Sequence, residues 1–220
     1  QVIIDIQRTR ADAAVAVGPG TLTDIARYAA FTCGIPFVSV PTAPSVDGYA
    51  SGSASLILRG EKFSVPAVCP AAVFADTDIL ARAPREMIAS GFGDMIGKYI
   101  SLFDWKFGAA AGAEPFSALA AEIARRALDA CAARVKEIGR GTEEGVAALT
   151  RSLLASGLAM LIFGASHPAS GAEHHISHYW EIEYLRAKRK PLLHGAKVGV
   201  ASALVADVYR RAAVEGLPEL

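Results

Sequence analysis

The sequence predicts an α/β region over residues 1–83 followed by an all-α region over residues 84–220. Two patterns support this division. In the first region, short apolar runs alternate with glycine turns and an amphipathic helix, which is the order of strand, turn and helix in α/β units. In the second region, one Ala- and Leu-rich helical pattern follows another. The chain has 220 residues and is 52% hydrophobic, which is enough to build one large domain or two modest ones.

The first strand and helix are predicted at Ala13–Val17 and Thr21–Ala30, joined by Gly18-Pro19-Gly20. A helix that begins directly after such a turn offers free N–H groups and the positive end of its dipole to a phosphate. Glycine also lets a phosphate oxygen approach the backbone closely. The alternative interpretation of the same triplet is an ordinary turn without a ligand.

A second strand is predicted at residues 35–40, and a loop rich in hydroxyl groups and turn formers follows it over Pro41–Ser51. Ligands of parallel α/β sheets bind outside the carboxyl ends of the strands, so this loop and the Gly18 turn should lie side by side at one ligand site. The alternative interpretation of Asp47-Gly48 within the loop is a simple turn. The two segments together predict a Rossmann-like nucleotide-binding domain.

A small β excursion is predicted over residues 54–60 and 63–68, and the run from Val73 to Asp76 ends the α/β region. Pro84 opens the helical region, in which Asp94 lies among glycines and apolar residues. A carboxylate in such surroundings is either a helix cap or a ligand, because an unpaired buried charge is costly. Packing helices are predicted at residues 115–138 and 142–163, the second capped by Thr142, and a last helix is predicted at 194–213.

All five histidines of the chain lie between residues 167 and 194. His174 and His178 lie one turn apart on the same face if the segment from Glu173 is helical, as two ligands or a ligand and an acid–base group would. Neutral imidazole is the commonest protein ligand of transition metals. The alternatives are a solvated helix face or a set of hydrogen-bonded interior histidines.

Composition argues against several kinds of partner. The formal net charge is zero, so neither nucleic acid nor a membrane surface is expected to bind. The basic run Arg186–Lys190 is interpreted as a solvated helix end. The densely apolar part of the longest uncharged run, Leu153–Phe163, is too short to cross a bilayer.

The cysteines Cys33, Cys69 and Cys131 are widely spaced and form no CxxC motif. This pattern suits a reducing compartment, and a cytoplasmic location is therefore expected.

Five motifs occur in order along the chain: residues 18–24 (GPGTLTD), 39–51 (SVPTAPSVDGYAS), 91–94 (GFGD), 171–178 (GAEHHISH) and 193–197 (LHGAK). In this combination the sequence resembles the glycerol-1-phosphate dehydrogenases, and most of all their bacterial, arabinose-operon-associated branch. That family belongs to the wider group of glycerol dehydrogenases, iron-type alcohol dehydrogenases and dehydroquinate synthases. The resemblance implies a dehydroquinate synthase-like fold.

The resemblance also implies roles for individual residues. Asp94, His174 and His194 match the positions that hold one divalent metal, zinc or nickel, and Asp47, Asp94 and His178 match positions that contact substrate, with His178 and Asp47 catalytic. His167 and His175 match no ligand position. The positions that match NAD or NADP binding are Gly18, Gly20, Thr21, Leu22, Thr23, Asp24, Thr42, Ala43, Pro44, Ser45 and Ser51.

The function implied is a metal-dependent, NAD(P)-linked reduction of dihydroxyacetone phosphate, a small phosphorylated triose, to sn-glycerol 1-phosphate in phospholipid metabolism, by a homo-oligomer. The alternatives are a glycerol dehydrogenase or dehydroquinate synthase-like enzyme on the same scaffold, or a non-catalytic metal-binding relative. Family members carry a longer segment before the first glycine turn than this sequence does, so the resemblance implies that the Rossmann-like domain is incomplete here. We therefore expect part of the cofactor domain to lie outside this sequence.

Overall fold

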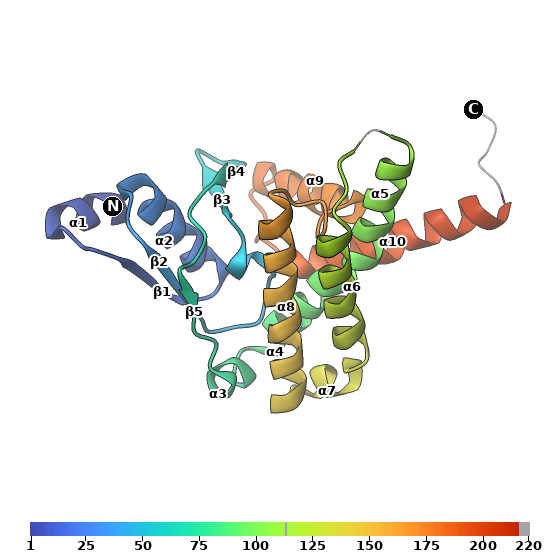
Figure 1. Ribbon diagram of the computed structural model, residues 1–220, viewed down its shortest axis with the longest axis horizontal. Helices are drawn as coiled ribbons and strands as arrows, with labels where there is room; N and C mark the ends of the chain where they lie inside the picture. Colours follow the sequence, from blue (N-terminus) through green and yellow to red (C-terminus); the bar gives the residue numbers. More distant parts are fainter. Residues whose placement is uncertain (113, 216–220) are drawn as a thin grey trace.

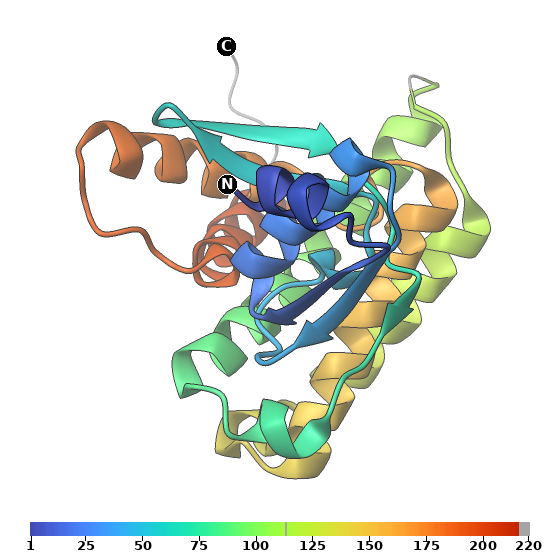
Figure 2. The ribbon, with the colours of Figure 1, turned by 90° about the vertical axis from the view of Figure 1, so that its left-hand side faces the viewer.

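The N-terminal part of the molecule is a small parallel sheet with a helix on one face (Figures 1 and 2). The computed structural model describes residues 1–112 and 114–215. Strands β1 (Ala14–Gly18), β2 (Phe37–Pro41) and β5 (Ala72–Val73) are parallel and lie in the order β1-β2-β5. Helix α2 (Gly20–Cys33) connects β1 to β2 and packs on both. The predicted α/β order is confirmed.

Burial alternates along the strands of this sheet. In β1, Ala16 and Gly18 are buried and Val15 and Val17 are exposed, so only one face of the strand is covered. Phe37 of β2 packs with Ala16 on the covered face. The second strand was predicted to be buried, and the structure buries one of its faces fully and the other only partly.

The chain forms one helix that the sequence did not predict before the sheet. Helix α1 (Val2–Thr9) packs against α2 but buries none of its own residues. The predicted β excursion is an antiparallel hairpin of β3 (Ser53–Leu58) and β4 (Glu61–Pro66). Arg59 and Gly60 both take positive φ angles at its turn, as a tight two-residue hairpin requires.

The rest of the molecule is helical and lies beside the sheet (Figure 1). Its core is formed mainly by apolar side chains of the helices within residues 77–163, among them Leu80, Met95 and Leu149. Residue 113 and residues 216–220 of the predicted second domain lie outside the described residues, and the division at residues 83 and 84 stays a prediction. The helices are α3 (Thr77–Ala81), α4 (Arg85–Ile96), α5 (Lys98–Ala110), α6 (Ala118–Ala132), α7 (Val135–Arg140), α8 (Glu143–Phe163), α9 (Ala172–Arg186) and α10 (His194–Glu215).

Two helix predictions need correction. The single helix predicted over residues 115–138 is two helices, α6 and α7, because Arg134 leaves helical geometry with φ −110° and ψ 21°. No glycine or proline marks this break in the sequence. The short helix α3 was not predicted, although Asp76 caps it by accepting hydrogen bonds from the backbone N–H groups of Asp78 and Ile79.

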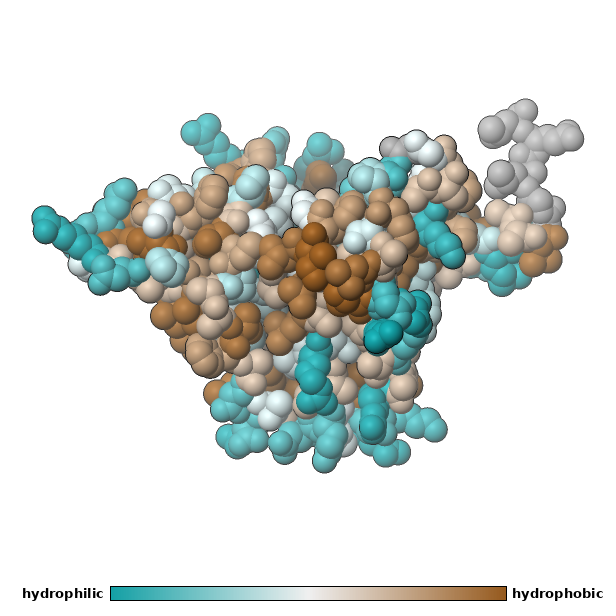
Figure 3. All heavy atoms as spheres, viewed as in Figure 1, coloured by the Kyte–Doolittle hydropathy of each residue, from teal (hydrophilic) through white to brown (hydrophobic). Residues whose placement is uncertain are grey.

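Helix α8 is the one described helix that is long and apolar enough to span a membrane by length and composition. Its Leu149 and Leu153 are buried in the core of the helical region, and it packs against α6, α7 and the loop after β2. Its C-terminal turns keep Leu158 and Ile162 exposed. Figure 3 shows apolar residues gathered in this part of the surface. The burial of its middle turns identifies α8 as a core helix.

Candidate metal centre and active site

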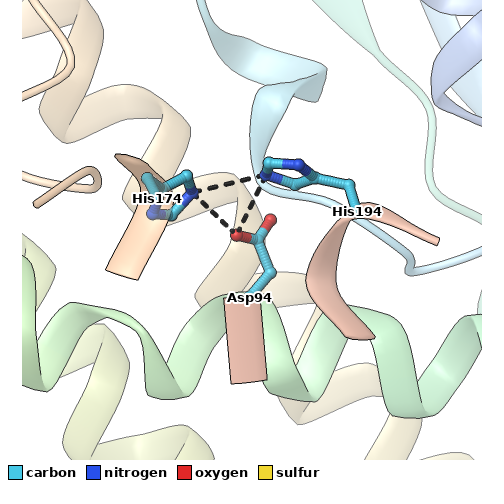
Figure 4. A group of neighbouring side chains, drawn as sticks. All are labelled: Asp94, His174 and His194. Atoms are coloured by element: carbon cyan, nitrogen blue, oxygen red, sulfur yellow. Dashed lines mark hydrogen bonds and ion pairs between the residues drawn. The ribbon is translucent and has the colours of Figure 1, made fainter. Parts of the chain in front are cut away.

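Three side chains from separate helices point toward one another in the helical region (Figure 4). Asp94 lies in α4, His174 in the first turn of α9, and His194 is the first residue of α10. The Nε2 atoms of the two histidines are 3.3 Å apart and lie 3.5 and 3.8 Å from Oδ1 of Asp94. The three potential ligand atoms all lie within 4.8 Å of one another.

Close packing of α4 against α10 brings two of these residues together. A Cβ atom on Gly93 would collide with the carbonyl oxygen of Gly195, and one on Gly195 would collide with that of Ser90. The N–H of Gly195 donates to Oγ of Ser90 at 3.1 Å. Glycines at this crossing therefore let the first turn of α10 lie directly on the middle of α4.

Asp94 is not a helix cap. It lies inside α4, whose N-cap is Pro84 and whose C-cap is Gly97. Its Oδ2 accepts a hydrogen bond from the backbone N–H of Asp47 at 2.9 Å. The carboxylate thus joins the loop after β2 to the histidine pair.

Glu173 orients the first of the two histidines. Its Oε1 lies 2.6 Å from Nδ1 of His174 and also accepts a hydrogen bond from the N–H of Gly171. A carboxylate on one ring nitrogen fixes the tautomer that leaves the other nitrogen free as a ligand. Nε2 of His174 is accordingly the atom that faces Asp94 and His194.

Around the three residues, buried carboxylates outnumber buried cations, which favours the binding of a divalent cation. Asp47, Asp94 and Glu173 are three buried carboxylates, and Lys98, also buried, is the only lysine or arginine paired with them in the described part of the chain. Its Nζ lies 2.8 Å from Oδ2 of Asp47 and 3.3 Å from Oδ1 of Asp94. Buried charges need compensation. Lys98 balances one carboxylate, and Asp94 and Glu173 raise the pKa of His174 against the effect of its burial, so a protonated His174 or a bound cation would balance another.

The distances also fit a metal ion. Ligand atoms bound to a tetrahedral ion with bonds of about 2.0–2.2 Å lie roughly 3.3–3.6 Å apart. The observed separations of 3.3 to 3.8 Å are close to these values. One carboxylate and two imidazoles form a donor set that suits zinc, nickel or iron and leaves coordination positions open for other ligands.

The pKa values of the two aspartates are shifted in opposite directions. Burial alone would raise the pKa of Asp94, but Lys98 and the two histidines hold it well below its ordinary value. Burial and the nearby charge of Asp94 raise the pKa of Asp47. The pKa of Lys98 is raised, because its two carboxylate partners outweigh its desolvation. The site therefore holds an ionised Asp94 at neutral pH.

His178 lies beside both histidines of the cluster. Its ring centroid is 6.0 Å from that of His174 and 5.9 Å from that of His194. Burial and the nearby charge of Lys62 lower its pKa to about 4, and burial lowers that of His194 to about 3. Both rings are thus neutral near pH 7, so His194 can act as a ligand and His178 can accept a hydrogen bond or a proton.

The two remaining histidines lie away from the cluster. His175 is exposed on the surface of α9. His167 packs against Phe163, with ring centroids 5.2 Å apart, and lies 6.1 Å from the ring of Trp105. Neither joins the three converging side chains, in line with the absence of a ligand role in the resemblance.

The glycine turn and the loop after β2 lie together, as parallel strands require. The N–H of Thr42 donates to the carbonyl oxygen of Gly18 at 3.3 Å, and Val46 packs against Gly20. Among the residues expected to bind the dinucleotide, Thr21 and Leu22 are exposed, whereas Thr23 is buried and its hydroxyl bonds to Pro19. The remaining ones vary in burial: Gly18, Ala43, Pro44, Ser45 and Ser51 are buried, and Gly20, Asp24 and Thr42 are half-buried.

Arg27 holds the end of this loop in place. Its guanidinium donates to the carbonyl oxygens of Gly48, Tyr49 and Ser53, and to Oγ of Ser51 at 2.8 Å. The hydroxyl of Ser51, one of the expected dinucleotide contacts, is therefore bonded to Arg27. The adjacent 3₁₀ turn at Gly48–Ala50 packs on α8.

The comparisons with known proteins agree with this geometry. A family model described as iron-containing alcohol dehydrogenase matches residues 2–84. The chain is 50% identical over 200 residues to a protein named glycerol-1-phosphate dehydrogenase [NAD(P)+] from Geobacillus thermodenitrificans, covering 91% of this chain and 50% of that protein. A protein of the same name from Bacillus subtilis is 50% identical over 209 residues, covering 94% and 53%.

The chain belongs to the glycerol-1-phosphate dehydrogenase family. It spans about half the length of the curated family members it matches. A Pyrococcus furiosus member is 40% identical over 196 residues, covering 89% of this chain and 56% of that protein. Membership of the arabinose-operon-associated branch stays a prediction.

Solved structures confirm the fold expected for the family. A probable glycerol dehydrogenase from Sinorhizobium meliloti superimposes with a TM-score of 0.75 at 23% identity, covering 99% of this chain and 65% of that one. An iron-containing alcohol dehydrogenase from Thermotoga maritima gives a TM-score of 0.69 at 15% identity, covering 96% and 59%. The α/β part followed by a helical part is thus the arrangement of this wider group.

Sequence reasoning missed three residues that shape the site. Glu173 directly precedes a histidine of the cluster and could have been recognised as its hydrogen-bond partner. Lys98 follows Asp94 at the i,i+4 spacing of a helical ion pair, which is the signal that could have found it. Arg27 gave no signal, because its four hydrogen bonds reach a loop more than twenty residues away.

Proposed function

We propose that the full-length protein is a divalent-metal-dependent, NAD(P)-linked dehydrogenase that reduces dihydroxyacetone phosphate to sn-glycerol 1-phosphate. The observation that carries the proposal is the convergence of Asp94, His174 and His194 within 4.8 Å in a chain about 50% identical to proteins named for this reaction. The reaction consumes one reduced nicotinamide cofactor and one proton for each ketone converted to an alcohol.

Asp94, His174 and His194 would hold one divalent ion, which when bound supplies Lewis-acid polarisation of a ketone oxygen. Glu173 keeps Nε2 of His174 aimed at that position. Lys98 offsets part of the negative charge of the buried carboxylates. The donor set leaves zinc, nickel and iron as candidates, and metal analysis identifies which one is present.

His178 and Asp47 are the proposed substrate-contacting and catalytic residues. His178 is neutral near pH 7 and lies one helical turn from His174, so its ring can bond a substrate hydroxyl, or can pass its N–H proton to the forming alkoxide while its other nitrogen takes a proton from water. Oδ2 of Asp47 accepts a hydrogen bond from Oγ of Ser156 at 2.9 Å and lies 2.8 Å from Nζ of Lys98. These contacts hold the aspartate beside the cluster.

The dinucleotide is proposed to bind at the turn from Gly18 to Asp24 and at the loop from Thr42 to Ser45, with Ser51 nearby. The support for this is that both segments follow the carboxyl ends of neighbouring parallel strands. Helix α2 begins at Gly20 and directs its positive end toward this edge of the sheet. The nicotinamide supplies the hydride, and the two segments would orient it.

A cytoplasmic location is also proposed, because all three cysteines are free thiols, as a reducing compartment favours. The homo-oligomer stays a prediction.

The test is turnover by the full-length protein. We expect oxidation of NADH or NADPH with dihydroxyacetone phosphate, loss of this activity on chelation, and its return on adding back zinc or nickel. Equal or better use of free dihydroxyacetone would point to a glycerol dehydrogenase and contradict the proposal. Metal uptake without NAD(H) binding would point to a non-catalytic relative.

A further inference from the structure

Two lysines and one glutamate form a second charged cluster beside the metal centre. Nζ of Lys62 lies 2.7 Å and Nζ of Lys197 lies 2.9 Å from the same atom, Oε2 of Glu181. The side chains of Lys62 and Lys197 are 12% and 4% exposed. Two largely buried ammonium groups thus share one carboxylate, which is the only one within ion-pair distance of either lysine in the described part of the chain.

The position of the Lys62–Glu181–Lys197 cluster follows from the helices that carry it. Glu181 lies three residues after His178 on α9, and Lys197 lies three residues after His194 on α10. Three residues rise about 4.5 Å along a helix and return to the same face. The cluster therefore lies one turn farther along both helices than the histidines.

The third member comes from the other half of the molecule. Lys62 lies on β4, and the hairpin places it against α9. The N-terminus of the 22-residue helix α10 adds a positive dipole end on the same side. Positive potential thus concentrates next to the proposed ketone position.

A cluster that only tied the hairpin to α9 would need Lys62 alone, whereas Lys197 on α10 adds a second ammonium group at the same carboxylate oxygen. A surplus ammonium group, kept largely out of water, is instead suited to an anion that arrives with the substrate. Dihydroxyacetone phosphate has such a group, because one methylene and one ester oxygen separate its ketone carbon from phosphorus. The 20% exposure of the Glu181 side chain and the 27% exposure of His194 leave the region open to a small anion.

We propose that Lys62 and Lys197 bind the phosphate group of the substrate and so determine the preference for a phosphorylated triose, while Glu181 holds both ammonium groups in place. This inference rests on the proposed function. It assigns substrate specificity to a contact between the β3–β4 hairpin and the helical region.

The experiment compares substrates with and without phosphate in the full-length, metal-loaded protein. For Lys62→Met and for Lys197→Met we expect the KM for dihydroxyacetone phosphate to rise at least about tenfold, while the KM for free dihydroxyacetone changes less than about threefold. Inhibition by inorganic phosphate should weaken in parallel. Lys136→Met, an exposed lysine on α7, is the matched control and should leave both constants unchanged.

Glu181→Gln separates a binding role from a structural one. It removes the competing charge but keeps a hydrogen-bond acceptor, so phosphate inhibition should stay equal or become stronger. If the cluster only anchors the hairpin, Glu181→Gln and Lys62→Met should instead lower the melting temperature together and change both KM values alike, which would overturn the inference.

A failure of the proposed function can be distinguished from a failure of the phosphate site. If the wild-type protein does not turn over dihydroxyacetone phosphate, that proposal fails, and titration of inorganic phosphate into the metal-loaded protein still tests the lysines. Unchanged phosphate affinity in both lysine variants would then refute the phosphate site by itself.

Discussion

Replacing Lys98 with methionine removes the cation that pairs with Asp47 and Asp94 and leaves the volume of the side chain nearly unchanged. Lys98 is fully buried, and its Nζ lies 2.8 and 3.3 Å from the two carboxylates. Breaking a buried ion pair by removing one partner costs about 3–5 kcal/mol, because the other charge stays buried. A domain is stable by only about 5–15 kcal/mol, so the loss is large enough to measure.

The stability lost in Lys98→Met should increase with pH. In the wild type, the pKa of Asp94 is lowered, so its stabilising contribution is present above the ordinary carboxyl pKa and disappears on acidification. In Lys98→Met both carboxylates lose their cation, and their pKa values in the folded state rise above those in the unfolded state. Ionisation then favours the unfolded state, so the stability of the variant falls as pH increases. The difference in unfolding free energy should therefore grow from about pH 5 to about pH 8.

The affinity for metal should increase in Lys98→Met, although the stability of the metal-free protein decreases. Lys98 competes with a cation for Asp94, so the methionine variant should lose stability without metal yet bind zinc more tightly, by about tenfold or more. Urea unfolding of the metal-free protein at several pH values and a zinc competition titration measure the two effects, with Lys136→Met as the control. A pH-independent loss below about 1 kcal/mol, or weaker zinc binding, would refute the reasoning.

Three further predictions concern other parts of the site. Glu173→Gln should weaken metal affinity about 10- to 100-fold without unfolding the protein, as a chelator competition would show, because His174 loses the carboxylate that orients it. Gly91→Ala should lower stability by about 2 kcal/mol or more in urea unfolding, since its Cβ would collide with the carbonyl oxygen of Pro44. Burial raises the pKa of Asp24 to about 6, so wild-type stability should fall as pH rises from about 4 to about 6 through this group. In melting curves Asp24→Asn should remove that fall and be more stable than the wild type at pH 7, and an unchanged pH profile would contradict this.

The α/β part was predictable because its physics is local. An apolar strand followed by Gly18 and an amphipathic helix specifies a βα unit, and parallel pairing then forces the loop from Pro41 to Ser51 next to the glycine turn. The break at Arg134 was not predictable, because helix propensity continues through it. Beyond the break, α7 packs against α8.

The metal cluster was predictable only in part. The spacing of His174 and His178 requires no tertiary information once the segment is helical. The role of Asp94 was not predictable in this way, because its local surroundings allowed both a helix cap and a ligand. Asp94 lies near the histidines because Gly93 contacts Gly195, and these glycines lie about a hundred residues apart in the sequence. Only the resemblance to the family favoured the ligand assignment before the structure.

The most direct test of the central claim is the metal content of the purified full-length protein, measured by elemental analysis for the wild type, Asp94→Ala and the control His175→Ala. We expect about one divalent ion per chain in the wild type and in His175→Ala, whose imidazole is exposed on the surface of α9. Asp94→Ala should lose the ion and keep its helical circular dichroism spectrum. A stoichiometric ion retained in Asp94→Ala, or none in the wild type after incubation with zinc or nickel, would contradict the metal centre.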